Sequence, residues 1–193
     1  TGGRASADFS VTGVAFDSRE VGRGDLFVAL SGAATDGHRF VGQAFAAGAA
    51  GVLVSEAVEG PNVRVGDTAQ ALDALARARR AACRGRIIGT TGSVGKTGSR
   101  EALFRALDRG APGRVHASVK SYNNHVGVPL SIARMPVDSE FGIFEMGMSA
   151  AGELAALTRL VRPNVALVTW VAQAHSAFFA DGQAIAEAMV GLF

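Results

Sequence analysis

A glycine-rich stretch, TGSVGKTG (residues 91–98), has the residue types that bind phosphate groups. An apolar run precedes it and a helical pattern follows it. Backbone N–H groups of the turn and the positive end of the helix dipole would therefore both point to one position at the start of the helix. Lys96 can reach a terminal phosphate, and the Thr97 hydroxyl can ligate magnesium. We therefore predict a nucleotide-phosphate site formed by Gly92, Ser93, Val94, Gly95, Lys96, Thr97 and Gly98.

This stretch meets only part of the phosphate-loop pattern G-x-x-x-x-G-K-[ST], because Thr90 occupies the first glycine position. What remains is G-x-x-G-K-T between a strand and a helix. The alternative is an ordinary glycine turn followed by an exposed lysine. The order, spacing and context of the residues favour the phosphate site.

Phosphoryl transfer also needs metal ligands, and carboxylates at the C-terminal ends of parallel strands are well placed to supply them. Glu145 ends the apolar run FGIFE, and His175 follows the run NVALVTWV. Glu145 could instead be a solvated residue at a strand end, and His175 could be a structural histidine. The triplet Asn123-Asn124-His125 lies between a strand and a helix, where a turn with a helix cap is an equally good interpretation.

The elements that must position these residues follow from the apolar periodicity. In the first part of the chain the patterns predict strands at 13–18, 25–30, 52–55 and 63–67 and helices at 40–50 and 68–84. In the second part they predict strands at 87–91, 114–118, 141–147 and 164–171 and helices at 99–109, 127–135, 152–161 and 182–193.

Apolar strands that alternate with helices are typical of a parallel sheet covered on both faces. We therefore predict an α/β protein with two domains. Residues 1–84 form a small N-terminal α/β domain. Residues 85–193 form a P-loop-type, mostly parallel sheet domain that is truncated partway through its sheet.

Composition narrows the function classes. The 19 basic and 17 acidic residues leave a formal net charge of +2 and form no basic block, which argues against a nucleic-acid partner. Cys83 is the one cysteine, so no internal disulfide can form and a reducing compartment fits. No apolar run is long enough to span a bilayer, and the N-terminus lacks an apolar signal core. We expect a cytoplasmic protein without a membrane partner.

Several motifs at fixed spacing resemble those of the Mur ligases of peptidoglycan synthesis. They are DSREVGRGDLFVAL, GAATDGHRF, TGSVGKTGSREAL, SYNNHVGVPLSIARMP, FEMGMSAAGE and the tract from RPNVALVTWV to AH. The resemblance implies magnesium ligation by Thr97, Glu145 and His175. It also implies that Asn124 and His125 line the nucleotide and metal site.

The reaction that this resemblance implies is ATP-dependent amide formation, with ATP and Mg²⁺ as cofactors. ATP would phosphorylate the terminal carboxylate of a UDP-N-acetylmuramoyl tripeptide, and the amine of D-alanyl-D-alanine would attack the acyl phosphate. Lys96 and His175 would be catalytic, Lys96 by neutralising charge on the moving phosphoryl group. The implied UDP-sugar site, whose members could also be ordinary turn residues, comprises Asp17, Ser18, Arg19, Asp36, Gly37 and His38.

The sequence departs from the family pattern around the presumed metal and acyl-phosphate region. Met189 stands where the family carries a carbamylated lysine, and a methionine cannot bind magnesium usefully. Ala177 replaces an acidic residue, and Ser149 and Ala150 replace an asparagine and a histidine.

Two alternatives to an active ligase follow. The family's third domain has no counterpart in this sequence, so we expect the isolated chain not to complete the ligation. A degenerate nucleotide- or UDP-sugar-binding module is the main alternative, and an unpaired sheet edge would favour its self-association. An unrelated P-loop kinase or NTPase is the other. The folate-polyglutamate ligases share the pattern of the central domain, but the DSR and DGH motifs before the phosphate loop argue against them.

Overall fold

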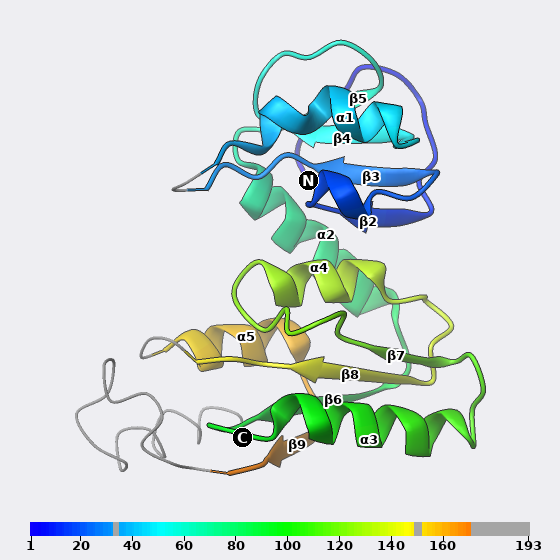
Figure 1. Ribbon diagram of the computed structural model, residues 1–193, viewed down its shortest axis with the longest axis vertical. Helices are drawn as coiled ribbons and strands as arrows, with labels where there is room; N and C mark the ends of the chain where they lie inside the picture. Colours follow the sequence, from blue (N-terminus) through cyan, green and yellow to red (C-terminus); the bar gives the residue numbers. More distant parts are fainter. Residues whose placement is uncertain (33–34, 149–151, 171–193) are drawn as a thin grey trace. The chain divides into compact units, whose positions relative to one another are not determined.

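The computed structural model describes residues 1–32, 35–148 and 152–170, and both of its parts combine a sheet with helices (Figure 1). The α/β class is therefore confirmed. The chain divides into two compact units, Thr1–Leu75 and Ala76–Phe193, so the division falls within helix α2 (Thr68–Ala82). The predicted boundary, between residues 84 and 85, lies just beyond this helix and stays a prediction.

The first unit contains a five-stranded sheet in the order β1-β5-β4-β3-β2. Strands β2 to β5 run parallel, and β1 pairs antiparallel with β5. Two 3₁₀ helices, η1 and η2, follow strands β2 and β3. The elements of this unit are β1 (Arg4–Ala5), β2 (Gly13–Ala15), η1 (Ser18–Glu20), β3 (Asp25–Val28), η2 (Gly37–Phe40), α1 (Val41–Ala46), β4 (Gly51–Val54) and β5 (Asn62–Arg64).

A small apolar core holds α1 to this sheet. Val41 and Ala44 of the helix lie in one cluster with Phe27, Val52 and Val54, all of them buried. The apolar runs that predicted β3 and β4 therefore correspond to largely or fully buried strands, whereas Arg64 at the end of β5 is exposed. The sequence did not predict β1, because both of its residues are exposed and a two-residue strand carries no apolar period.

The second unit contains a four-stranded parallel sheet in the order β7-β8-β6-β9. Helices α4 and α5 lie on one face of it and α3 on the other (Figure 1). The elements are β6 (Arg86–Thr91), α3 (Lys96–Asp108), β7 (Val115–Ala117), α4 (Gly127–Arg134), β8 (Phe141–Glu145), α5 (Glu153–Val161) and β9 (Val165–Val168).

The main core of this unit lies between the sheet and the α4–α5 face. Ile87 and Phe144 of the sheet pack with Val128 of α4 and Leu157 of α5, and all four are buried. The cluster fixes β6 beside β8 with Thr90 opposite Glu145. The C-terminal ends of both strands thus meet at the edge where α3 begins.

Several elements have other bounds than the sequence predicts, such as β2, which ends at Ala15 where η1 soon follows, and α1, which ends at Ala46 rather than at residue 50. One predicted helix falls outside the described residues. Helix α3 begins at Lys96, three residues before the predicted start, because the turn passes directly into the helix through Gly95. The helix predicted at 182–193 lies outside the described residues. Within the described part of the second unit, β7 and β9 are the edges of the sheet, and self-association through an edge stays a prediction.

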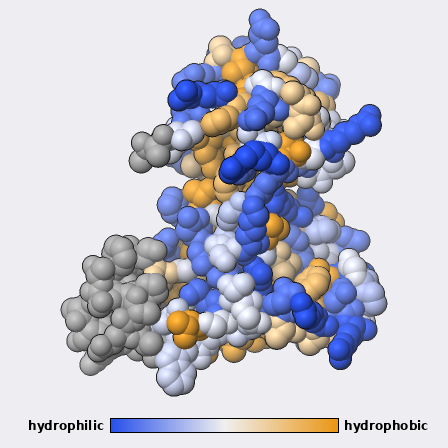
Figure 2. All heavy atoms as spheres, in the orientation of Figure 1, coloured by the Kyte–Doolittle hydropathy of each residue, from blue (hydrophilic) through white to orange (hydrophobic). Residues whose placement is uncertain are grey.

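Hydrophobic residues are interspersed with hydrophilic ones on the face of the molecule shown in Figure 2. The large apolar side chains that are exposed include Val94 and Trp170. Within the described residues, no helix is both long enough and apolar enough to cross a membrane.

Candidate nucleotide and metal site

The glycine-rich turn joins β6 to α3 and has the backbone form that the sequence predicts. Gly92 and Gly95 both have positive φ angles, 139° and 87°, which side-chain-bearing residues rarely adopt. Thr90, by contrast, is still inside β6 and pairs with Glu145 in β8. A residue in a strand does not need glycine's freedom, so the missing first glycine leaves the turn intact.

The turn is closed by its own lysine and by the end of β9. The Lys96 Nζ donates a hydrogen bond of 2.6 Å to the carbonyl oxygen of Gly92. Thr169, just after β9, donates from its hydroxyl to the Val94 carbonyl at 2.6 Å, and the Ser93 N–H donates to the Trp170 carbonyl at 2.7 Å. The lysine ammonium is thus held over the turn, where a phosphate would lie.

Glu145 is the acidic centre of the site and is almost completely buried, with 1% of its surface exposed. Its Oε2 accepts a hydrogen bond from the Thr97 hydroxyl at 3.0 Å, and its Oε1 accepts one from the Asn123 side-chain amide at 2.9 Å. The backbone N–H of Glu145 donates to the Ser118 hydroxyl at 3.1 Å. The carboxylate and the Thr97 hydroxyl, predicted separately as metal ligands, therefore lie side by side.

These oxygen atoms fit a hard divalent cation, since Mg²⁺ is bound in proteins by one or two carboxylates together with phosphate oxygens and waters. Glu145 and Thr97 could hold it beside the phosphates that the turn would cradle. The third predicted ligand, His175, lies outside the described residues. So do Met189, Ala177 and the pair Ser149–Ala150.

The two adjacent asparagines have different surroundings. Asn124 accepts hydrogen bonds with its Oδ1 from the N–H groups of Val126 and Gly127 at 3.2 and 2.8 Å, so it helps to start helix α4. Asn123, for which the sequence predicted no separate role, donates from its side-chain amide to Glu145. The backbone carbonyl of Asn123 accepts a hydrogen bond from the Gly147 N–H at 2.7 Å. His125 is exposed. The roles of Asn124 and His125 toward a nucleotide stay predictions.

Ser118 and Arg100 are further members of the site that sequence patterns did not reveal. Arg100 is 8% exposed and donates from Nη1 to the Ser118 carbonyl at 2.8 Å. In the sequence it resembles any charged residue of an amphipathic helix. The one available signal was its spacing, since it lies one helical turn after Lys96 and Thr97.

Candidate substrate residues of the first unit

The first predicted group follows strand β2. The Asp17 carboxylate accepts from the Arg19 backbone N–H at 3.0 Å, which starts the 3₁₀ helix η1, and forms an ion pair with the Arg19 guanidinium at 2.6 Å. Ser18 is buried, and its hydroxyl donates to the Gln43 side-chain oxygen at 2.7 Å. Asp17 and Arg19 therefore form a local ion pair at the surface, whereas Ser18 anchors the turn to α1.

The second group follows β3 and connects to the end of β4. The His38 Nδ1 lies 2.7 Å from the Asp36 carboxylate, and its Nε2 accepts from the Ser55 backbone N–H at 2.9 Å. A backbone N–H can only donate, so the neutral ring carries its proton on Nδ1 and donates it to Asp36. Gly37 is buried between these two residues.

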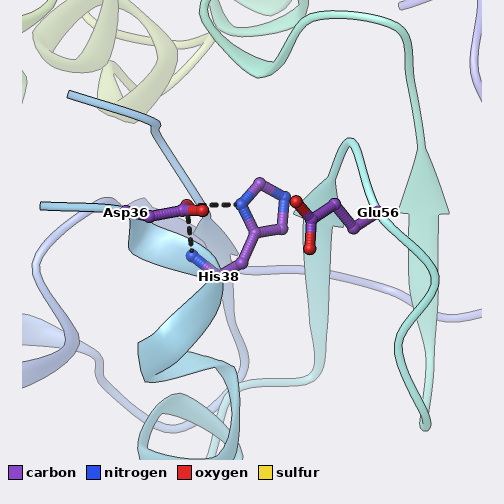
Figure 3. Close-up of side chains that lie close together, drawn as sticks. All are labelled: Asp36, His38 and Glu56. Carbon is purple, nitrogen blue, oxygen red and sulfur yellow. Dashed lines mark hydrogen bonds and ion pairs between the residues drawn. The ribbon is translucent and has the colours of Figure 1, made fainter. Parts of the chain in front are cut away.

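Glu56 lies on the side of the His38 ring away from Asp36 (Figure 3). One ligand atom from each of these three residues falls within 4.8 Å of the others. A metal would need a free lone pair on the imidazole, but Nε2 is engaged by Ser55 and Nδ1 by Asp36. This group therefore does not fit a metal and instead orients the loop that carries Asp36 and His38.

A pH-dependent stability is expected from Asp36. The hydrogen bond from the His38 backbone N–H, followed by that from its ring, lowers the pKa of the Asp36 carboxyl below its ordinary value of 3.8. The stabilisation is therefore fully present above the unfolded-state pKa and is lost as the pH falls through the lowered one. Denaturant unfolding of the unsubstituted chain and of Asp36→Asn should be measured from above the unfolded-state pKa of Asp36 to below its lowered pKa in the folded state. The difference in unfolding free energy between the two proteins should shrink toward low pH. A difference that does not vary with pH would contradict this assignment.

Comparison with known proteins

Two family descriptions match the chain along its length. Residues 90–193 match the Mur ligase middle domain, and residues 10–80 match the Mur ligase family catalytic domain. The first of these matches alone covers more than half of the 193 residues.

Among curated proteins, the chain is 40% identical over 183 residues to the UDP-N-acetylmuramoyl-tripeptide–D-alanyl-D-alanine ligase of Bacillus subtilis. The aligned part covers 92% of this chain and 40% of that enzyme. It is 34% identical over 189 residues to the Escherichia coli ligase of the same name, with 97% and 41% covered. The chain thus spans about 40% of the length of the curated relatives it matches.

Solved structures give the same picture. MurF from Acinetobacter baumannii superposes with a TM-score of 0.80 at 30% identity, over 93% of this chain and 40% of that one. MurF ligase from Thermotoga maritima in complex with ADP superposes with a TM-score of 0.77 at 30% identity, over 94% of this chain and 43% of that one.

Proposed function

The chain belongs to the Mur ligase family, and from that premise we propose that it forms the nucleotide-binding and UDP-sugar-binding part of an ATP-dependent amide ligase. The observation that carries the proposal is the convergence of Lys96, Thr97 and Glu145 at the end of β6. A lysine ammonium held over a glycine turn, beside a buried carboxylate and a hydroxyl, suits a nucleoside triphosphate with its divalent cation.

The reaction we propose joins a UDP-N-acetylmuramoyl tripeptide to D-alanyl-D-alanine. The terminal carboxylate of the tripeptide attacks the γ-phosphorus of ATP, which releases ADP and leaves an acyl phosphate. The dipeptide amine then attacks the acyl carbon, loses a proton and expels inorganic phosphate. The substrate names come from the relatives, whose full length is about two and a half times the matched part.

In this reaction the residues of the turn bind and neutralise charge. The Lys96 ammonium would leave the Gly92 carbonyl for a phosphate oxygen, and the N–H groups of the turn would hold the phosphates. Bound Mg²⁺ would supply further neutralisation of the phosphate oxygens. Glu145 and Thr97 would hold that cation, and Asn123 would keep the carboxylate oriented.

The first unit supplies the proposed UDP-sugar site. Asp17 to Arg19 follow β2, Asp36 to His38 follow β3, and Ser55 follows β4, so all of them lie beyond the C-terminal ends of parallel strands. Ligands of open α/β sheets bind at that edge. The hydrogen bonds of His38 to Asp36 and Ser55 would present a preformed polar surface to the sugar nucleotide.

The decisive experiment is calorimetric titration of the chain with a non-hydrolysable ATP analogue, with and without Mg²⁺. We expect Mg²⁺-dependent binding. The Lys96→Ala variant should weaken it by about tenfold to a hundredfold, because a charged hydrogen bond contributes roughly 1.5–3 kcal/mol. Absence of binding by a folded chain would overturn the nucleotide half of the proposal.

A binding module without ligase activity is the second candidate, and Met189 at the position of the family's lysine favours it. A UDP-muramoyl peptide should raise the melting temperature of the Lys96→Ala variant as much as that of the unsubstituted chain if the sugar site is independent of the nucleotide site. Stabilisation by the UDP-sugar together with no response to ATP would select the second candidate.

A further inference from the structure

Arg100 is an unusual residue to find buried. Of the 13 residues of α3, all of them described, it is the one that is buried, with 8% of its surface exposed. Arginine is almost never fully buried unless it is paired, because its charge cannot be removed by deprotonation. Among the apolar residues of the same helix, Leu103, Phe104 and Leu107 remain partly exposed and the two alanines are exposed. The helix therefore directs a permanent positive charge toward the sheet.

The guanidinium of Arg100 connects two elements beyond its own helix. Its Nη1 donates to the carbonyl oxygens of Ser118 and Lys120, in the segment that leaves β7. The same nitrogen lies 3.9 Å from Oε2 of Glu145. That separation is too long for a hydrogen bond but gives a strong attraction between two buried opposite charges.

The segment that Arg100 holds carries contacts to Glu145 at both ends. At its start, the Ser118 hydroxyl accepts from the Glu145 N–H, and at its end the Asn123 amide donates to the Glu145 carboxylate. Between them, Lys120 has a φ of 54°, a left-handed backbone angle that is unfavourable for a residue with a side chain. Such an angle persists only where surrounding contacts maintain it, and the bond to Arg100 is one of them.

We propose that Arg100 is a positioning residue for the metal-binding carboxylate. It holds the segment 118–123 in the form that places Asn123 on Glu145, and it keeps the buried carboxylate paired before a cation arrives. Removing Arg100 should free this segment and weaken the response of nucleotide binding to Mg²⁺. The metal part of this inference rests on the proposed function, whereas the segment part rests on the contacts alone.

The segment part can be tested by limited proteolysis with an endoproteinase that cleaves after lysine. The sequence has two lysines, Lys96 and Lys120, so each site reports on one place. In Arg100→Met, cleavage after Lys120 should become about tenfold faster relative to cleavage after Lys96, because only the local segment is released. Equal acceleration at both lysines would show global destabilisation and overturn the inference, as would no acceleration.

A matched control on the same helix is Arg105→Met. Arg105 is exposed and forms an ion pair of 3.1 Å with Glu101 one turn away. It touches neither the 118–123 segment nor Glu145 in the described contacts, so its loss should leave both cleavage rates unchanged. A response equal to that of Arg100→Met would contradict the specific role of Arg100.

The metal part is tested by calorimetry with the ATP analogue in the unsubstituted chain, Arg100→Met and Arg100→Lys. The gain in affinity from Mg²⁺ should fall about tenfold in Arg100→Met, as is usual when a residue that orients a metal ligand is lost. Binding without Mg²⁺ should be unchanged, and Arg100→Lys should recover part of the gain. An unaltered gain in Arg100→Met would overturn the inference.

The two experiments separate the inference from the function it depends on. If the unsubstituted chain gains nothing from Mg²⁺, the proposed function fails and the metal part of the inference fails with it. The proteolysis result then still decides whether Arg100 positions the segment.

Discussion

Replacing Glu145 with alanine should lower the free energy of unfolding by about 3 kcal/mol, because breaking a buried pair leaves the other charge buried and uncompensated. The charge left behind is the guanidinium of Arg100, which lies 3.9 Å from the Glu145 carboxylate. The hydrogen bonds from Thr97 and Asn123 would lose their acceptor as well. Denaturant unfolding measures the loss, and titration with Mg²⁺ and the ATP analogue should show no metal response.

The matched control for this substitution is Glu140→Ala. Glu140 forms an ion pair of 2.7 Å with Arg114, but both side chains are exposed, at 41% and 55%. A surface pair of this kind contributes about 0–1 kcal/mol. Equal losses in Glu145→Ala and Glu140→Ala would contradict the view that burial makes the first pair important.

A double substitution adds a sharper test of the same pair. If the loss in Glu145→Ala comes from an uncompensated cation, Arg100→Met on that background should restore part of the stability. Strictly additive losses would mean that the two side chains act independently.

Replacing Gly92 with alanine is the second substitution with a large expected effect. A Cβ at this position would lie 2.1 Å from the Thr169 hydroxyl and 3.0 Å from the backbone nitrogen of Trp170, and φ is 139°. Thr169 cannot easily move, because its hydroxyl bonds to the Val94 carbonyl. Strain and overpacking together should cost about 3 kcal/mol in unfolding free energy. Nucleotide binding should be lost, since the turn must open to admit the methyl group.

Gly98→Ala is the matched control for Gly92→Ala. Gly98 lies inside helix α3, and among the described residues no atom beyond its chain neighbours and the backbone of its own helix lies within 4 Å of a Cβ built on it. Alanine should therefore stabilise the chain by about 1 kcal/mol through its higher helix propensity. A destabilised Gly98→Ala variant, or a Gly92→Ala variant as stable as the unsubstituted chain, would contradict the described geometry of the turn.

Gly92, Lys96 and Thr97 were identifiable because the strand, the turn and the helix that shape their site are consecutive in the chain. Glu145 was identifiable because a carboxylate at the end of an apolar strand stands out. Arg100 and Ser118 gave no such signal, since a charged helix residue and a serine after a strand are common.

By itself, the sequence determined the α/β class, the glycine turn between β6 and α3 and the acidic strand end, because each depends on short-range periodicity and on residues that are neighbours in the chain. Only the tertiary structure decided which side chains surround Glu145, since Thr97 and Asn123 are 48 and 22 residues away from it. Asn123 and Asn124 are the same residue type at adjacent positions, so no pattern could distinguish them. In the structure, Asn124 accepts hydrogen bonds from N–H groups at the start of α4, whereas Asn123 donates to Glu145 at the end of β8.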